Sequence, residues 1–139
     1  MHTGDPLAWN CLIQRIDAWS GFLAMWAGIA KPEEAKRMVE ENYRNTKTFN
    51  SPAGVRSLSK LEKMYAIKAS GNPSCWLGPV WINVNYFTGK GLIKYRYLKD
   101  AKDLAKKTIV ILRYDYERSE ALHKYYQPEN GQPFINKEF

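Results

Sequence analysis

The chain has 139 residues and a formal charge of +7, and 45% of its residues are hydrophobic and 14% aromatic. This length fits one domain, and the apolar and aromatic content excludes a disordered linker or tail. No apolar run reaches the roughly 20 residues that cross a bilayer, and the opening residues lack the basic start of a secretion signal. We therefore expect a single folded unit over residues 1–139, cytoplasmic and not bound to a membrane.

The cysteine count argues against a disulfide framework and against a structural metal. Cys11 and Cys75 are the two cysteines, and neither has a companion Cys or His at zinc-like spacing. We expect reduced thiols, no metal and no cofactor.

The positive charge is concentrated in residues 90–118, where acidic residues are interleaved with the basic ones. Mixed signs of this kind are typical of a solvated helix face. No helix-turn-helix, zinc-finger or RNA-recognition pattern accompanies the charge. Nucleic acid is therefore a disfavoured partner, although a basic nucleic-acid binder is kept as an alternative to be tested at low salt.

The first predicted helical pair covers residues 17–43. The segment from Asp17 to Ala30 carries apolar residues on nearly every side, which indicates a buried inner helix. Pro32 restarts a helix, since proline is tolerated in the first turn, and the helix should run to about Tyr43. Its single apolar stripe is typical of an outer helix; the stripe is Ala35, Met38, Val39 and Asn42/Tyr43.

The second predicted pair follows a crossing over residues 45–79 that is rich in proline and glycine. A loop of this length is usually functional. Pro79 should open a third helix that is apolar on many sides and runs to about Tyr97. A fourth helix from Lys99 to about Glu117 shows one stripe: Ala101, Leu104, Ala105, Ile109 and Leu112. Four helices supply too little interior to cover two apolar ones, so the chain looks like part of a larger helical body.

Residues 72–86 read Asn-Pro-Ser-Cys-Trp-Leu-Gly-Pro-Val-Trp-Ile-Asn-Val-Asn-Tyr. This stretch resembles the Asn-Pro-x-x-Trp-x-Gly-Pro-[Val/Ile]-Trp…Asn-Tyr pattern of glycoside hydrolase family 63 and its trehalase-like relatives. The similarity continues in residues 19–35, 49–59 and 122–131 and covers about residues 15–136. It implies an all-α fold, a partial (α/α)6 toroid with inner and outer helix layers, of which this chain is the C-terminal segment.

The resemblance also implies a reaction. The family cleaves α-glucosidic bonds with inversion, using an Asp acid and a Glu base that face each other about 6.5 to 9.5 Å apart. The acid lies upstream of the matched region and has no counterpart here. At the base position this sequence has Lys124, and an ammonium has no lone pair to accept a proton. The resemblance thus implies a fragment or remnant of an inverting α-glucosidase-type enzyme for α-glucosides or oligosaccharides, inactive alone.

Two further departures from the family pattern are Leu77, where relatives often carry Arg or Gln, and Arg96, where they often carry Gly. By resemblance, the candidate sugar-binding residues are Arg15, Trp76, Trp81, Asn83, Asn85, Tyr86 and His123. Each has a structural alternative. The tryptophans would be core residues, the asparagines buried amides, Arg15 a surface ion pair, His123 a structural residue and Lys124 a solvated side chain.

A hypothesis of a different class remains open. The chain would then be a non-catalytic carbohydrate-binding or self-assembling helical module, in which several copies cover the exposed inner helices. The expected partners are accordingly a carbohydrate and either further copies of the chain or the missing part of the barrel.

Overall fold

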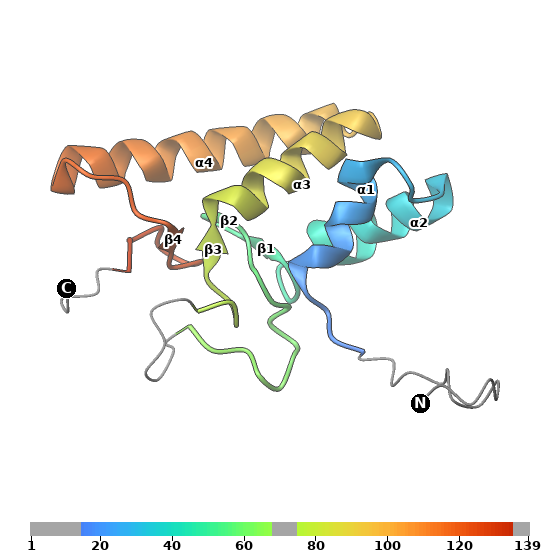
Figure 1. Cartoon of the computed structure of the whole chain (residues 1–139), viewed down its shortest axis with the longest axis horizontal. Coiled ribbons are helices and arrows are strands. Elements are labelled where there is room, and N and C mark those ends of the chain that lie inside the picture. The colour runs from blue at the N-terminus through green and yellow to red at the C-terminus, as the bar shows by residue number, and fades with distance from the viewer. Residues whose placement is uncertain (1–14, 68–74, 135–139) are drawn as a thin grey trace, which may run out of the picture.

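The computed structural model describes residues 15–67 and 75–134 (Figure 1). All four predicted helices are confirmed. They are a 3₁₀ turn Trp19–Phe22 leading into α1 (Leu23–Ala27), α2 (Pro32–Arg37) continued by a π-helical turn Met38–Tyr43, α3 (Ile82–Lys94) and α4 (Leu98–Ser119). Among them, α3 packs against both α1 and α4. In the described part of the chain, no helix combines the length and apolar character needed to span a membrane.

The first helical pair is shorter than its sequence pattern suggested. Gly28 ends α1 with φ +81°, a left-handed conformation that closes a helix and favours glycine. Pro32 opens α2 as expected, and the Glu34 carboxylate accepts a hydrogen bond from the Lys31 backbone N–H at 2.9 Å. The predicted stripe of α2 is confirmed, because Ala35 and Val39 are buried.

The second pair begins three residues later than expected. Val80 and Trp81 form a short strand, so α3 starts at Ile82 rather than at Pro79. Between α3 and α4 the chain turns through Arg96, whose φ is +67°. A side chain in this left-handed region is strained. The glycine that the family resemblance expects at position 96 would adopt this conformation without strain.

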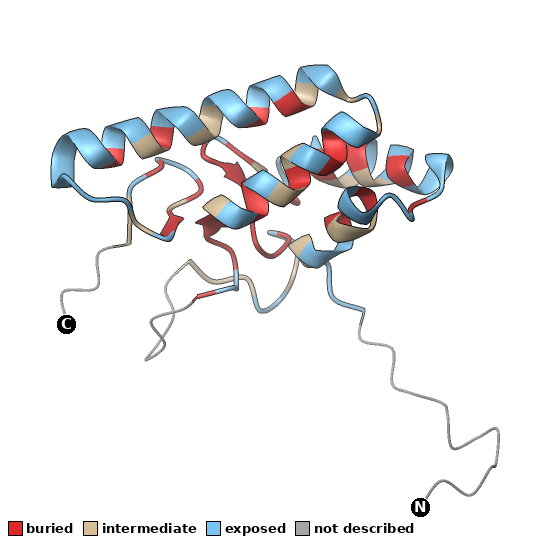
Figure 2. Cartoon of the chain, turned by 45° about the horizontal axis from the view of Figure 1, so that its top comes forward, coloured by how far each residue is buried: buried red, intermediate tan, exposed pale blue. Residues whose placement is uncertain are grey.

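The predicted stripe of α4 is partly wrong. Ala101 and Leu104 are buried, but Ala105 is exposed and Ile109 is 64% exposed. The buried positions continue instead through Ile111 and Asp115. Both rows of side chains are compatible with a helical period, and the sequence favoured the more apolar one. Figure 2 shows the resulting pattern, with buried residues along one side of α4 and exposed residues along the other.

Two antiparallel ribbons link the helices at their ends, and the sequence did not reveal them. β1 (Asn50–Ser51) pairs with β2 (Gly54–Val55), and β3 (Val80–Trp81) pairs with β4 (Tyr125–Tyr126). A bridge between Arg56 and Val80 joins the two ribbons. Strands of two residues are too short to show an alternating pattern. The crossing that was expected to be irregular therefore contains a hairpin.

The core lies between α3 and its two helical neighbours. A Cβ on Gly91 would lie 3.0 Å from the Met25 Cβ and 3.1 Å from the Trp26 backbone nitrogen, so α1 and α3 approach closely. Trp26 of α1 is nevertheless 43% exposed, and Ile29, just after α1, is 77% exposed. The inner helix therefore has apolar surface that the described residues do not cover, as the sequence suggested.

Candidate functional site

Four aromatic rings gather where the N-terminal ends of α1 and α3 meet β4. We call Trp19, Trp76, Trp81 and Tyr125 the aromatic stack. The rings of Trp76 and Trp81 are nearly parallel with centroids 3.9 Å apart, and Trp81 stacks on Tyr125 at 4.7 Å. The Trp19 and Trp76 ring centroids are 6.0 Å apart. Segments more than 100 residues apart in sequence thus form one aromatic surface, with Trp19 and Tyr125 as the members that the sequence analysis missed.

Burial separates the members of the stack. Trp81 is 7% and Tyr125 is 8% exposed, and the Trp81 indole N–H donates to the Cys75 carbonyl at 2.8 Å. Trp76 is 38% exposed. Trp81 is therefore a core residue, which is the structural alternative given for it above. Its ring supports that of Trp76, which is exposed to solvent.

Lys124 lies at the edge of the stack. It precedes Tyr125 in the chain, and Tyr125 pairs with Trp81 across the β3–β4 ribbon. The Lys124 carbonyl accepts a hydrogen bond from the Ile82 N–H at 3.5 Å, while its side chain is exposed. Residue 124 is thus held by its backbone at the first turn of α3, next to the aromatic surface.

A buried carboxylate anchors the strand that follows Lys124. Asp115 of α4 accepts hydrogen bonds from the Tyr126 hydroxyl at 2.7 Å and from the His123 backbone N–H at 2.9 Å. His123 Nδ1 lies 3.0 Å from both carboxylate oxygens, and the Ser119 hydroxyl donates at 3.1 Å. We call Asp115, Ser119, His123 and Tyr126 the Asp115 cluster. His123 therefore has a structural contact of the kind named as its alternative.

Electrostatics favour the ionised form of Asp115. Burial opposes ionisation, but the hydrogen bonds from Tyr126, His123 and Ser119 outweigh it, so the pKa of Asp115 lies below its ordinary value. Burial and the neighbouring carboxylate raise the pKa of Tyr126, which remains a neutral donor. The sequence carries no signal for this cluster, because the burial of Asp115 is visible only in the structure.

Three further candidate residues, Arg15, Asn83 and Tyr86, are exposed. Asn83 is exposed on the first turn of α3, on the same helix face as Phe87, whose ring stacks on Trp19 at 6.4 Å. Tyr86 is 60% exposed and lines a groove between α3 and α4. Arg15 is exposed at the start of the described chain. Asn83 and Tyr86 are thus neighbours on α3, and the Phe87 ring contacts both Tyr86, at 5.5 Å, and Trp19 of the stack.

Asn85 is buried and its amide is fully engaged. It accepts from the Val55 N–H at 2.9 Å and donates to the Thr108 hydroxyl at 3.0 Å. A Cβ on Gly54 would lie only 2.3 Å from this amide, which explains the glycine in the hairpin. Asn85 therefore holds the β1–β2 ribbon against α3 and α4, which is the buried-amide alternative and not an exposed sugar donor.

The described residues offer little for a reactive thiol or a metal site. Cys75 is buried and unbridged, with its Sγ 3.5 Å from the Ala66 carbonyl oxygen. Within residues 15–67 and 75–134, His, Cys, Asp and Glu do not gather in groups of three that would suit a metal ion. Cys11 and the first three residues of the Asn72–Tyr86 motif lie outside the described residues.

Comparison with known proteins identifies the family. The model of the mannosylglycerate hydrolase MGH1-like glycoside hydrolase domain matches residues 12–139. The chain belongs to this family. A curated relative, mannosylglycerate hydrolase from Rubrobacter radiotolerans, is 38% identical over 56 residues, which are 40% of this chain and 12% of that protein.

Solved structures show the same fold. The GH63 mannosylglycerate hydrolase from Thermus thermophilus in complex with glucose has a TM-score of 0.71 and 22% identity, over 86% of this chain and 27% of that one. Its complex with Tris and D-glycerate gives 0.70 and 23%, over 86% and 26%. A sialidase reaches 0.72 at 10% identity, over 89% and 12%. The family member described here is a partial (α/α) barrel, as predicted, and spans about a quarter of the Thermus enzyme.

Proposed function

We propose that this glycoside hydrolase domain forms one sector of the sugar-binding wall of an inverting α-glucosidase-type enzyme, and that it does not hydrolyse glycosides alone. The observation that supports this most directly is Lys124, which lies beside the aromatic stack where the family resemblance expects the catalytic base. The reaction requires a carboxylate there to take a proton from water. A lysine ammonium has only donors to offer.

The nearest buried carboxylate does not replace the missing base. Asp115 accepts hydrogen bonds from Tyr126, His123 and Ser119, so its lone pairs are engaged within the protein. Its side chain is fully buried, whereas a general base must reach a water molecule. Asp115 therefore supports the segment that carries residue 124 and takes no part in proton transfer.

Trp76 is the ring of the stack that we assign to the sugar. It is exposed, and Trp81 fixes its plane from below at 3.9 Å. A flat aromatic surface suits the apolar face of a pyranose. Asn83 lies nearby on the first turn of α3 and is the amide that we assign to a sugar hydroxyl. The proposed substrates are small α-glucosides and, by likeness to the relatives, mannosylglycerate.

A chimera tests the proposal. This chain replaces the matching segment of the Thermus thermophilus enzyme, with Lys124 kept in one chimera and Lys124→Glu in the other. We expect hydrolysis of mannosylglycerate or an α-glucoside only with the glutamate, and none from the isolated chain. If the lysine chimera, folded by circular dichroism, turns over substrate as fast as the glutamate one, residue 124 is not the base position and the proposal fails.

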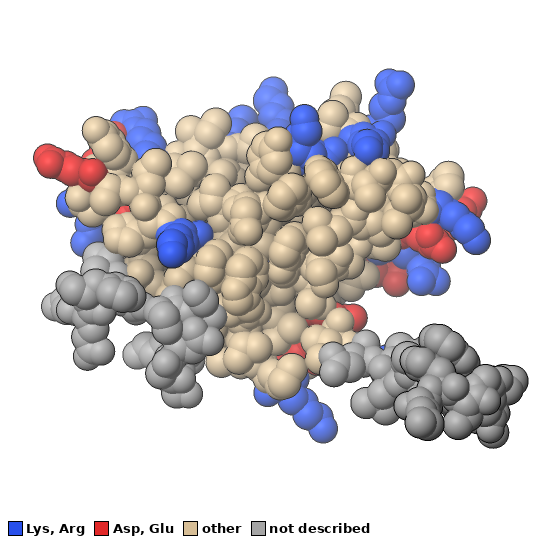
Figure 3. All heavy atoms as spheres, in the orientation of Figure 1, with Lys and Arg blue, Asp and Glu red and all other residues tan. Residues whose placement is uncertain are grey.

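An apolar groove of about 300 Å³ between α3 and α4 separates the barrel sector from the second candidate, a self-assembling module. Tyr86 and Ile93 of α3 and Ile109 of α4 line it and are more than half exposed. Figure 3 shows that the middle of this view carries few charges, below the Lys and Arg side chains that follow the α4 edge. We assign the groove to a further helical pair of the barrel wall, because the chain spans only about a quarter of the Thermus enzyme.

Co-expression with the rest of the Thermus barrel tests this assignment. Ile109→Glu should abolish co-purification, whereas Val110→Glu should not, because both residues are 64% exposed but only Ile109 lines the groove. Self-association of the isolated chain in sedimentation, lost on Ile109→Glu, would instead support the self-assembling module. Equal effects of the two variants would contradict the groove as a docking site.

A further inference from the structure

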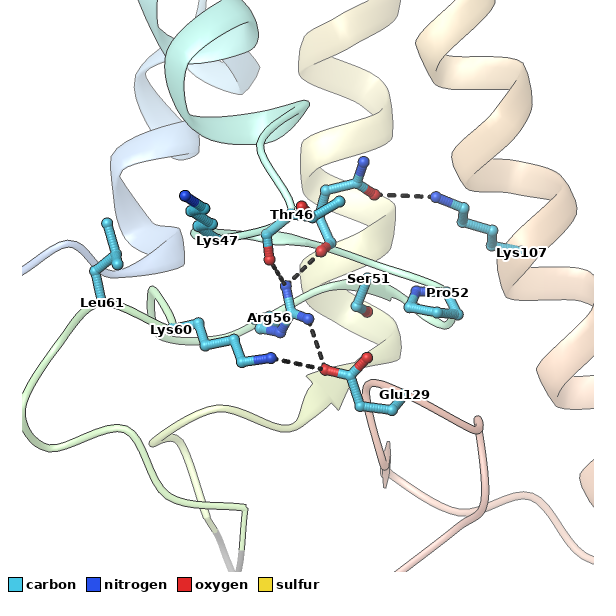
Figure 4. A pocket seen from close by; sticks show the side chains of 10 residues that line it. Thr46, Lys47, Ser51, Pro52, Arg56, Lys60, Leu61, Lys107 and Glu129 are labelled. Atoms are coloured by element: carbon cyan, nitrogen blue, oxygen red, sulfur yellow. Dashed lines mark hydrogen bonds and ion pairs between the residues drawn. The ribbon is translucent and has the colours of Figure 1, made fainter.

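A cavity of about 720 Å³ lies between the end of the α2 segment, the β1–β2 ribbon, α4 and the loop after β4 (Figure 4). None of its lining residues belongs to the aromatic stack, so it is a separate site, independent of the proposed function. Its wall includes Asn50, Arg56, Lys60, Lys107 and Glu129.

The wall of the cavity is cationic. Four basic side chains, those of Lys47, Arg56, Lys60 and Lys107, line it with a single acidic one, Glu129. Asp103, just outside the lining, lies 3.0 Å from Lys107. Counting both acids, the four cations leave a surplus of two positive charges. A recess lined mostly by one sign of charge concentrates the field and attracts small anions.

Arg56 marks the floor of the cavity. It is 2% exposed, and its Nη1 donates to the carbonyls of Thr46 at 3.1 Å and Thr48 at 3.4 Å, and also to that of Asn50. Its Nη2 donates to Glu129 at 2.8 Å. Its buried Nε–H has no hydrogen-bond partner among the described residues. The buried Tyr65 hydroxyl lies beside this guanidinium, so Arg56 is held within the protein and fixes a positive charge under the cavity.

Two lysines approach the guanidinium from opposite sides (Figure 4). Lys60 Nζ lies 3.6 Å from the Glu129 carboxylate, and Lys107 Nζ lies 3.1 Å from the Asn50 side-chain oxygen. The Lys60 side chain is 50% exposed and that of Lys107 is 22% exposed, and each ammonium has further protons to donate. An oxyanion between them would receive donors from both walls.

We propose that this cavity binds a small phosphate monoester, with the phosphate between Lys60 and Lys107 above Arg56. A phosphate monoester carries about two negative charges at neutral pH and three acceptor oxygens, which match the surplus charge and the converging donors. The volume exceeds that of a phosphate group alone, and Thr46 on the wall carries a hydroxyl that can meet the rest of the molecule. A sugar phosphate is the class that fits.

The test is a calorimetric titration at low salt with glucose 6-phosphate, sulfate and glucose. The cavity variant Lys60→Gln/Lys107→Gln is compared with Lys36→Gln/Lys102→Gln, which removes the same charge from exposed positions of α2 and α4. We expect saturable binding of the phosphate ester, weakened about tenfold or more only in the cavity variant. Circular dichroism confirms folding, and Lys60→Gln alone replaces the double variant if it unfolds.

Three outcomes would overturn the proposal. They are absence of saturable binding at low salt, equal weakening in the two double variants, and sulfate binding as tightly as the ester, which indicates an adventitious ion only. Glucose, which has no phosphate, probes the aromatic stack in the same titrations. Any glucose binding that is lost on Trp76→Ala but kept in the cavity variant belongs to the proposed sugar wall, so the two proposals fail separately.

Discussion

Two buried charges tie the ribbons of this protein to its helices, and they differ in how completely they are paired. Asp115 is 1% exposed, and three neighbouring side chains and a backbone N–H surround its carboxylate. Arg56 is 2% exposed, but its Nε–H has no partner among the described residues and its acidic neighbour Glu129 is 52% exposed. The buried partners of Asp115 make its cluster a structural element that positions the chain. The exposed partner of Arg56 leaves that group next to solvent, where a ligand can reach it.

The largest effect should come from removing the Arg56 guanidinium. Arg56→Met leaves the carbonyls of Thr46, Thr48 and Asn50 without their shared donor and takes from Glu129 its nearest cation. We expect the free energy of unfolding to fall by about 3–5 kcal/mol, the usual cost of breaking a buried charged group from its partners. Chemical denaturation measures it, and a loss below that of Asp115→Asn would reverse the comparison.

Asp115→Asn should cost about 2–3 kcal/mol near neutral pH, because it replaces charge-assisted hydrogen bonds from Tyr126 and His123. The pKa of Asp115 is lowered in the folded chain, so its contribution is full above about pH 4 and is lost as the pH falls through the lower folded pKa.

The variant should therefore lose stability less steeply than the parent below about pH 4. The pKa of Glu129 is also lowered, by Arg56 first, so a residual slope of the same sign should remain in the variant. Urea unfolding at several acidic pH values tests this. Parallel curves for parent and variant would show that Asp115 does not titrate as inferred.

Tyr126→Phe should cost about 1 kcal/mol, because one donor leaves a carboxylate that keeps its contacts with His123 and Ser119. The remaining partners keep the Asp115 cluster closed. Thermal unfolding measures the change. A cost as large as that of Asp115→Asn would mean that the hydroxyl holds the whole cluster.

The smallest expected effect has the opposite sign and lies outside both clusters. Arg96 has φ +67°, a conformation that glycine adopts without strain. We expect Arg96→Gly to raise the free energy of unfolding by about 0.5–1 kcal/mol. Chemical denaturation measures this change on the same scale as Arg56→Met, Asp115→Asn and Tyr126→Phe. A decrease in stability would assign the Arg96 side chain a stabilising contact that outweighs its backbone strain.

The helices could be predicted from the sequence because their apolar residues recur with the helical period over several turns. The barrel was predicted from the family resemblance. The ribbons could not, since β3 and β4 have two residues each and their pairing joins Trp81 to Tyr125. The sequence places Ala105 and Ile109 in the core because apolar character alone does not tell a core from a docking groove.

The candidate site was predictable only where its residues lie close together in the sequence. Trp76 and Trp81 lie within one motif and stack directly, whereas Arg56 and Glu129 pair across 73 residues. No local pattern marks a partner at that distance. Asp115 could be read as one more charge on an outer helix until its burial was known.

The backbone hydrogen bond between Ile82 and Lys124 bears on which side chains evolution can place at position 124. The chain at residue 124 is placed by its carbonyl and by the paired Tyr125, not by its own side chain, which is exposed. Selection for folding therefore places little constraint on the side chain there. Lysine and glutamate codons differ by a single nucleotide, so one point mutation would exchange this ammonium for the carboxylate that our proposal requires, on an unchanged backbone.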